Sequence, residues 1–205
     1  KADMTYLSQI GIENVMLLRG DPPRGSHVFP APVDGFRYAS DLIAFVKNHF
    51  SFAIGAAANP ETHPEAPDMQ TYLENLKIKY DAGANFMITQ LFFNNEVYYQ
   101  FVEVVRKMGI NCRIIPGIIP ITGYNQIQRF VNMASTSFPA DLLDKMETFR
   151  EDADKIYQIG VDHAIRQCVE LLDRGAPGIH FYTLNKSRAA VEVFESLPGK
   201  VSPLQ

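Results

Sequence analysis

Five apolar segments, each followed by a segment with helical periodicity, constrain the fold of this 205-residue chain more than any other feature of its sequence. The apolar segments are residues 14–18, 52–58, 85–93, 112–120 and 179–184. Strands that are apolar along their whole length are buried on both faces, which is typical of parallel sheets covered by helices. Because crossovers between parallel strands are right-handed, the pattern predicts a parallel α/β fold, either an open doubly wound sheet or a β/α barrel.

The segments between the strands carry the helical patterns. Ser40 is the predicted N-cap of the helix after the first strand, and residues 139–175 are expected to be helical throughout. A helix is also predicted from about Asp68, with Asn75 and Lys79 off its apolar stripe. The residues of that stripe are Met69, Tyr72, Leu73, Leu76 and Tyr80.

The absence of nucleotide-binding glycine motifs favours the barrel over the doubly wound sheet. No strand is followed by a Gly-x-Gly-x-x-Gly fingerprint or a P-loop, so a dinucleotide-binding Rossmann fold lacks its motif. Five units cannot close a standard eight-stranded barrel, and the chain begins without a methionine, so we expect the front of a larger protein to be missing. Residues 1–197 are predicted to form one partial barrel domain, and residues 198–205 an unstructured tail.

Composition and charge exclude several classes of function. A formal net charge of −4 and a pI near 5.7 provide no basic footprint for nucleic acid. No apolar run approaches the roughly 20 residues that span a bilayer, and the N-terminus has no signal-peptide pattern. Cys112 and Cys168 are too few for a disulfide framework and match no zinc spacing. These features predict a cytoplasmic protein without a structural metal or a membrane partner.

Polar side chains gather where the predicted strands end. In parallel α/β proteins the C-terminal edge of the sheet is where ligands bind. The first strand ends in Arg19-Gly20-Asp21, which could equally be a solvated turn or an accidental Arg-Gly-Asp adhesion tripeptide. The residues expected at this edge are Arg19, Asp21, Asn59, His63, Gln90, Gly117, Thr183, Asn185 and Lys186.

The five histidines differ in their settings. His63 lies in a rigid loop between Thr62 and Pro64 and is the best binding candidate among those considered. The histidines that lie in helix or strand patterns are expected to be structural; these are His49, His163 and His180.

Seven short segments resemble methylenetetrahydrofolate reductase in their order and spacing across nearly the whole chain. They are Leu-Arg-Gly-Asp (18–21), Tyr-Ala-Ser-Asp (38–41), His-Pro-Glu-Ala (63–66), Asp-Ala-Gly-Ala-Asn (81–85), Ile-Thr-Gln-Leu-Phe-Phe (88–93), Ile-Pro-Gly-Ile-Ile-Pro (115–120) and His-Phe-Tyr-Thr-Leu-Asn (180–185). The resemblance implies an FAD-binding (β/α)8 TIM barrel, of which this chain supplies about the last five units. The family's general-acid glutamate would lie on the first strand, upstream of Lys1.

The resemblance also implies roles at the cofactor. Arg19, Gly20 and Asp21 would line the flavin. Asp21, the catalytic candidate, would also lie near the folate, where a carboxylate stabilises the cationic iminium during hydride transfer. The ribityl, diphosphate and adenosine portions of FAD would be bound by Tyr38, Ala39, His63, Ala66, Asn75 and Lys79. Without the family, Lys79 would be a plain solvated charge on a helix.

For the substrate, the resemblance implies that Gln90 and Gln126 hydrogen-bond the pterin or the nicotinamide amide. A glutamine within an apolar strand needs a partner, since burial without one costs about 1–3 kcal/mol, and a ligand or a backbone group would serve Gln90. Phe130 would stack on substrate or nicotinamide, or otherwise be a core aromatic.

Four positions depart from the family pattern. Asn59 stands where relatives usually carry Tyr, which removes a ring expected near the flavin. Tyr72 and Ile78 replace polar residues that help to hold FAD. Lys186 replaces Arg, so it keeps a positive charge for a folate carboxylate but loses bidentate geometry.

The implied activity is hydride transfer from NADH or NADPH through FAD to 5,10-methylenetetrahydrofolate, giving 5-methyltetrahydrofolate, by a homo-oligomer. One alternative is a β/α-barrel enzyme that acts on a carbonyl or phosphorylated metabolite without flavin. The other is a non-catalytic partner or regulatory subunit that keeps the barrel.

Overall fold

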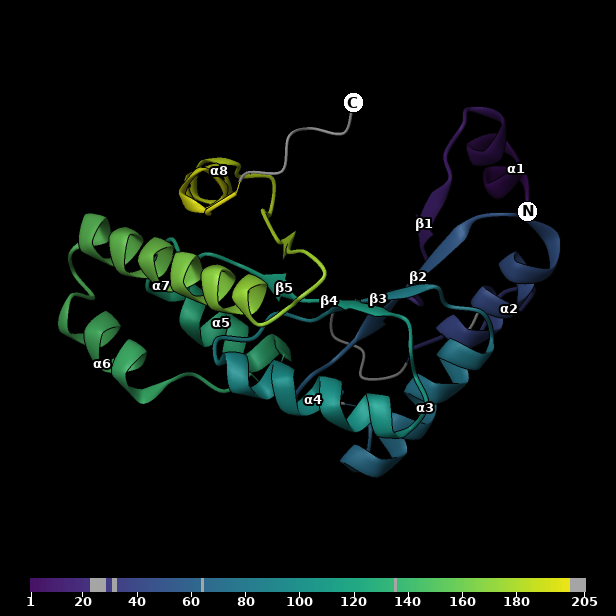
Figure 1. Ribbon diagram of the computed structural model, residues 1–205, viewed down its shortest axis with the longest axis horizontal. Helices are drawn as coiled ribbons and strands as arrows, with labels where there is room; N and C mark the ends of the chain where they lie inside the picture. The colour runs from purple at the N-terminus through teal and green to yellow at the C-terminus, as the bar shows by residue number, and fades with distance from the viewer. Residues whose placement is uncertain (23–28, 31–32, 64, 135, 200–205) are drawn as a thin grey trace.

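The computed structural model of the chain describes residues 1–22, 29–30, 33–63, 65–134 and 136–199. Helices and strands alternate along most of the chain (Figure 1). The elements are α1 (Ala2–Gln9), β1 (Asn14–Met16), α2 (Ala39–His49), β2 (Ala53–Ala58), α3 (Met69–Asp81), β3 (Phe86–Thr89), α4 (Asn95–Lys107), β4 (Arg113–Ile115), β5 (Gly117–Ile118), α5 (Asn125–Ala134), α6 (Ala140–Thr148), α7 (Ala153–Asp173), β6 (His180–Phe181) and α8 (Arg188–Ser196). In the predicted tail, residues 200–205 lie outside the described part of the chain.

All strand pairs between the described residues are parallel, as the sequence predicts. One sheet has the order β1-β2-β3-β4, and β5 pairs with β6. The strand order follows the chain order without the reversal that defines a doubly wound sheet. The topology is therefore that of consecutive β/α-barrel units.

The predicted strand over residues 112–120 is divided at Pro116 into β4 and β5. Proline has no N–H to give to a ladder, but its carbonyl still accepts a hydrogen bond from His180 N at 2.9 Å. Gly117 N turns to Thr89 Oγ1, also at 2.9 Å. The chain therefore changes pairing partner at Pro116, from β3 to β6.

The main core lies between the strands and the helices that cover them. In β2, Ile54, Ala56 and Ala58 are buried and belong to this core, which also includes residues from α2, α3, α4 and α7. A second apolar cluster joins the loops after β3 and β5 to α5, α6 and α7. The helices thus fix the strand ends from outside.

Two predicted helix boundaries are wrong. Helix α2 begins at Ala39 with Tyr38 as N-cap, because the Asp41 carboxylate accepts a hydrogen bond from Tyr38 N at 3.0 Å. Residues 139–175 form two helices, α6 and α7, separated around Phe149–Asp152. Asp152 starts α7 by accepting a hydrogen bond from Lys155 N at 3.0 Å.

The predicted stripe of α3 is confirmed over most of its length. Tyr72, Leu73 and Leu76 are buried, and Tyr80 packs partly against the core. Met69, in the first turn of α3, is 39% exposed. The helix begins directly after Asp68, close to the predicted start. Asp68 is its N-cap, because its side chain accepts a hydrogen bond from Thr71 N at 2.7 Å.

Candidate functional site

Arg19 lies shortly after β1 and forms a bidentate ion pair with Glu65, which lies in the loop after β2. Arg19 Nη1 lies 2.7 Å from Glu65 Oε2, and Nη2 lies 2.6 Å from Oε1. The guanidinium carbon also lies 4.8 Å from the centre of the Phe29 ring. The hydrogen-bonded ion pair raises the pKa of Arg19 and lowers that of Glu65, since each charge stabilises the other.

Lys79 reaches from α3 toward β2 and is not the solvated charge that its sequence setting suggests. Its Nζ donates a hydrogen bond to Ala57 O at 3.1 Å, and its side chain is partly buried. Burial, and secondarily the charge of Arg19, lowers the pKa of Lys79. This ammonium group is therefore held at the sheet and near another cation.

His63 is the third member of this group. Its Nδ1 accepts a hydrogen bond from Glu65 N at 3.1 Å, so the neutral ring carries its proton on Nε2. Burial is the main cause that lowers the pKa of His63, with Glu65 opposing the shift and Lys79 adding to it. Arg19, His63 and Lys79 together form what we call the cationic cluster.

An aromatic cavity of about 260 Å³ opens beside Arg19. Its lining residues are Leu18, Arg19, Phe29, Gly35, Phe36, Tyr38 and Leu42. Tyr38 is 52% exposed and Phe36 is 38% exposed, so both rings present surface to a ligand. Ala39 follows Tyr38 in the first turn of α2.

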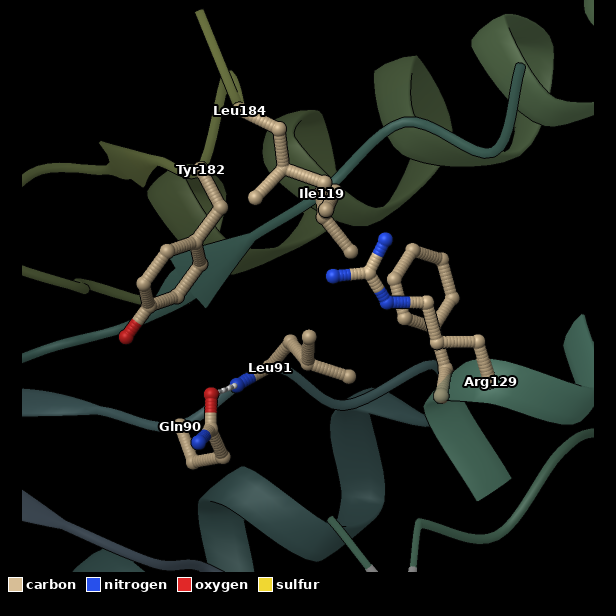
Figure 2. A pocket seen from close by; sticks show the side chains of 7 residues that line it. Gln90, Leu91, Ile119, Arg129, Tyr182 and Leu184 are labelled. Carbon is tan, nitrogen blue, oxygen red and sulfur yellow. Dashed lines mark hydrogen bonds between the residues drawn. The ribbon is translucent and has the colours of Figure 1, made fainter. Parts of the chain in front are cut away.

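A second cavity, of about 180 Å³, lies at the ends of β3, β5 and β6 (Figure 2). Its lining residues are Gln90, Leu91, Ile119, Arg129, Phe130, Tyr182 and Leu184. Gln90 Oε1 accepts a hydrogen bond from Leu91 N at 3.0 Å. Among the described residues the Gln90 amide nitrogen has no hydrogen-bond partner, which leaves its two N–H groups for a ligand.

Aromatic packing fixes the walls of this second cavity. Tyr182 donates its hydroxyl hydrogen bond to Thr89 O at 2.9 Å. Phe130 is 1% exposed and its ring centre lies 5.9 Å from that of Phe93, so it is a core aromatic that also lines the cavity. The Arg129 guanidinium extends toward Ile119 and Leu184 across the opening (Figure 2).

The other predicted site residues are more scattered. Asp21 is exposed, and its charge acts on Arg19 and His63. Gly20 takes a φ of 86° between the two charged residues. Ala66 packs partly against the core, whereas Asn75 and Lys186 are exposed and outside both cavities.

Gln126 does not line either cavity. Its Oε1 accepts hydrogen bonds from Thr122 N at 2.7 Å and from Thr122 Oγ1 at 3.3 Å. The side chain thus stabilises the turn before α5. Arg129, one helical turn further along, lines the second cavity in its place.

Two of the departures from the family pattern contact each other. Asn59 N donates a hydrogen bond to the Tyr72 hydroxyl, and Tyr72 is 3% exposed. Burial raises the pKa of Tyr72. The Tyr72 phenol of α3 therefore holds the end of β2 at Asn59, the position where relatives usually carry a Tyr ring.

His49, His163 and His180 contact backbone carbonyls or neighbouring rings. His163 lies 3.0 Å from Phe93 O through Nε2, and exposed His49 lies 2.7 Å from Phe45 O through Nδ1. His180 is half-buried against the Tyr182 ring, with 4.9 Å between ring centres.

The described residues contain no group of three or more His, Cys, Asp or Glu side chains arranged to hold a metal ion. Cys112 and Cys168 are free thiols, and both are buried.

Sequence reasoning missed several residues of the site. Glu65 lies inside the His-Pro-Glu-Ala segment but had no expected role, and Arg129 lies directly before Phe130. No polar pattern in the sequence points to Phe29, to Phe36 or to the wall of the second cavity around Tyr182. Only their position in the folded structure assigns them to the site.

Parallel strands in chain order, outer helices and a polar C-terminal strand edge define a β/α-barrel class of protein. A solved structure described as an uncharacterised protein from Clostridium thermocellum that binds two copies of 5-methyl-5,6,7,8-tetrahydrofolic acid shares this fold, with a TM-score of 0.52 and 16% identity. The alignment covers 85% of this chain and 64% of that one.

Residues 1–198 match the family model for methylenetetrahydrofolate reductase, and the chain belongs to that family. It is 40% identical to a probable methylenetetrahydrofolate reductase (NADPH) from Caenorhabditis elegans, over 96% of this chain and 30% of that protein. It is 35% identical to methylenetetrahydrofolate reductase (NADH) 1 from Arabidopsis thaliana, over 91% of this chain and 33% of the relative. For 5,10-methylenetetrahydrofolate reductase from Escherichia coli, identity is 37% over 91% and 61% of the two chains.

Proposed function

We propose that the protein carrying this chain transfers a hydride from NADH or NADPH, through FAD, to the methylene carbon of 5,10-methylenetetrahydrofolate, giving 5-methyltetrahydrofolate. The observation that carries the proposal is that the candidate cofactor residues and the candidate substrate residues lie at the same C-terminal edge of the parallel strands. The cationic cluster beside an aromatic cavity follows β1 and β2, and the Gln90 amide faces a second cavity after β3. Cofactor and substrate groups would thus meet at one edge of the sheet.

The cationic cluster and the aromatic cavity fit FAD. The Lys79 ammonium has one hydrogen bond within the described residues and so retains donors for a diphosphate. The remaining Arg19 N–H groups and His63 Nε2–H add further donors. Exposed rings at Phe36 and Tyr38 suit a planar ring system. Bound there, FAD supplies the chemistry of accepting a hydride and passing it on.

Asp21 and Gln90 would act on the substrate. The exposed Asp21 carboxylate would stabilise the positive charge of the folate iminium as hydride is transferred. The free N–H groups of Gln90 would orient the pterin or the nicotinamide. Phe130 would contact the ring of either substrate, and Lys186 and Gln126 are proposed contacts that would require movement of their side chains.

Steady-state kinetics of the full-length protein test the reaction order. Because both substrates would use the same flavin in turn, initial-rate plots at several fixed NAD(P)H concentrations should be parallel. Intersecting lines would contradict this order. A protein that binds no added FAD would be a flavin-independent enzyme, and one that binds FAD without reductase activity would be a non-catalytic barrel subunit.

Substitution Asp21→Asn tests the role of the carboxylate. We expect kcat for methylenetetrahydrofolate reduction to fall on the order of 100-fold, because a charge that faces the developing cation is lost. The rate at which NAD(P)H reduces the flavin, measured as the loss of the flavin's visible absorbance, should change much less. The control is Asp144→Asn on the exposed face of α6, and equal kcat for both variants would show that Asp21 has no such role.

We propose also that the protein is a cytoplasmic homo-oligomer. Val191 and Phe194 on α8, each 47% exposed, are the apolar side chains that we propose for the subunit contact. No helix among the described residues is long and apolar enough to cross a membrane. Light scattering after gel filtration should give a mass above that of one chain, and a monomer at micromolar concentration would refute the oligomer.

A further inference from the structure

Glu65 holds the Arg19 side chain in one orientation. Both oxygens of the carboxylate are used, at 2.7 and 2.6 Å, and Phe29 lies against the guanidinium. Arg19 Nε is directed to Gly20 O at 3.4 Å. A guanidinium has five N–H groups, so these contacts leave two of them, one on each Nη atom, for a ligand.

The backbone of Glu65 acts on a second member of the cationic cluster. Glu65 N donates to His63 Nδ1, which places the proton of the neutral ring on Nε2. Thr62, the residue before His63, has a φ of 106°, a conformation that L-residues rarely adopt. Through its backbone N–H and its carboxylate, Glu65 thus contacts both His63 and Arg19.

The charges around Arg19 explain why an acid is needed there. Burial lowers the pKa of both His63 and Lys79, and the charge of Arg19 adds to each shift because a nearby positive charge disfavours the protonated form. Arg19 and the Lys79 ammonium therefore repel each other. Glu65 is the acid paired with Arg19 within the described residues. Without it, Arg19 could relieve the repulsion by turning toward solvent, since its end of the site is open and its side chain is flexible.

We propose that Glu65 is a positioning residue of the cofactor edge: its carboxylate fixes the Arg19 fork, and the two remaining Arg19 N–H groups face a bound dinucleotide. Glu65 itself does not contact the cofactor. The inference rests on the proposed function, because it takes FAD as the ligand of the cationic cluster.

The test is the affinity of the FAD-free full-length protein for added FAD, followed by quenching of flavin fluorescence. Glu65→Gln keeps the backbone N–H to His63, removes the charge and replaces one of the two oxygens that accept from Arg19 with an amide nitrogen that cannot accept. We expect the Kd for FAD to rise about tenfold, the loss of roughly one charge-assisted hydrogen bond. Glu65→Asp has a shorter side chain that cannot reach both Arg19 nitrogens. Its Kd for FAD should therefore lie between those of the wild type and Glu65→Gln.

A double-mutant cycle separates positioning from a general structural effect. In an Arg19→Gln background, adding Glu65→Gln should change the Kd less than twofold, because the group through which Glu65 acts is already gone. Thermal unfolding of each FAD-free variant records any loss of stability separately. The matched control is Glu74→Gln, an exposed acid on α3, which should leave the Kd unchanged.

The outcomes are distinct. If the wild type binds FAD and Glu65→Gln binds it equally well, or if the two substitutions act independently in the cycle, the Glu65 proposal is overturned and the proposed function stands. If the wild type binds no FAD, the proposed function fails first, and the positioning role falls with it.

Discussion

At the scale of single residues, the site depends on side chains whose neighbours alter their chemistry. Lys79 is an ordinary helix lysine by sequence, yet it is partly buried and hydrogen-bonded to Ala57 O. Gln90 satisfies its carbonyl oxygen on the backbone and keeps its donors free. Both side chains are only partly buried, and the donors that they leave unused within the described residues are the ones that we propose for a ligand.

Lys79→Met separates stability from cofactor binding. The substitution removes an ammonium whose charged form burial disfavours, so we expect the unfolding midpoint in urea of the FAD-free protein to stay the same or rise. The Kd for FAD should rise about tenfold through the loss of a charged donor. Lys155→Met on the exposed first turn of α7 is the control, and unchanged FAD affinity in Lys79→Met would remove Lys79 from the site.

Gly117→Ala tests the close packing behind the second cavity. A Cβ at this position would lie 2.3 Å from Thr89 O and 2.6 Å from a Tyr182 ring carbon. The backbone oxygen cannot move freely, so we expect a loss of about 1–3 kcal/mol in the free energy of unfolding by urea. Gly123→Ala, which meets nothing within 4 Å, should be close to neutral. Equal stability of the two variants would show that Gly117 in β5 is not packed this closely against Thr89 and Tyr182.

At the scale of elements, α3 is the helix that carries cofactor residues on a structural frame. Tyr72 holds the end of β2 through Asn59 N, while Lys79 reaches β2 through Ala57 O. Asp68 caps the helix and starts it directly after the loop that contains His63. The position of the cationic cluster therefore depends on where α3 begins.

The cap of α3 can be tested against that of α7. Asp68→Ala and Asp152→Ala each remove a side-chain acceptor from a helix N-terminus, so both should lower the melting temperature. Only Asp68→Ala should also weaken FAD binding, because α7 carries no predicted site residue. The same loss of FAD affinity in both variants would mean that general destabilisation, rather than the placement of α3, controls the site.

At the scale of the whole molecule, histidine burial predicts how stability depends on pH. Burial is the main cause that lowers the pKa of His63, His163 and His180. The unfolded chain, with a histidine pKa near 6.5, therefore binds more protons than the folded chain at mildly acidic pH. The contribution of these histidines to the free energy of unfolding is then fully present above about pH 6.5. It is lost as the pH falls through their lower pKa values in the folded state.

Urea unfolding at pH 7 and pH 5 measures this dependence. The free energy of unfolding should be lower at pH 5, and the difference should shrink in His163→Gln, which removes one of the three titrating groups. Glu65, whose pKa Arg19 lowers, contributes in the same direction but at lower pH. Greater stability at pH 5 than at pH 7 would contradict the histidine account.

The amino-acid sequence alone predicts the parallel β/α architecture, the succession of strands and helices along the chain and a set of polar residues at the C-terminal ends of the strands. These properties follow from local patterns: apolar runs, helical periodicity and the polar segments that end each strand. The resemblance to the family is carried by the same segments, because they are contiguous along the chain.

The tertiary structure decided which of those polar residues meet, because contacts between distant segments leave no local signal. It paired Arg19 with Glu65 and placed the partly buried Lys79 side chain against β2. It also turned Gln126 back to Thr122 and placed Arg129 at the second cavity. The Gln126–Thr122 contact spans only four residues, but the Arg19–Glu65 pair, the contact of Lys79 with β2 and the second cavity depend on packing between segments far apart in sequence. The strand and helix patterns, by contrast, depend only on near neighbours.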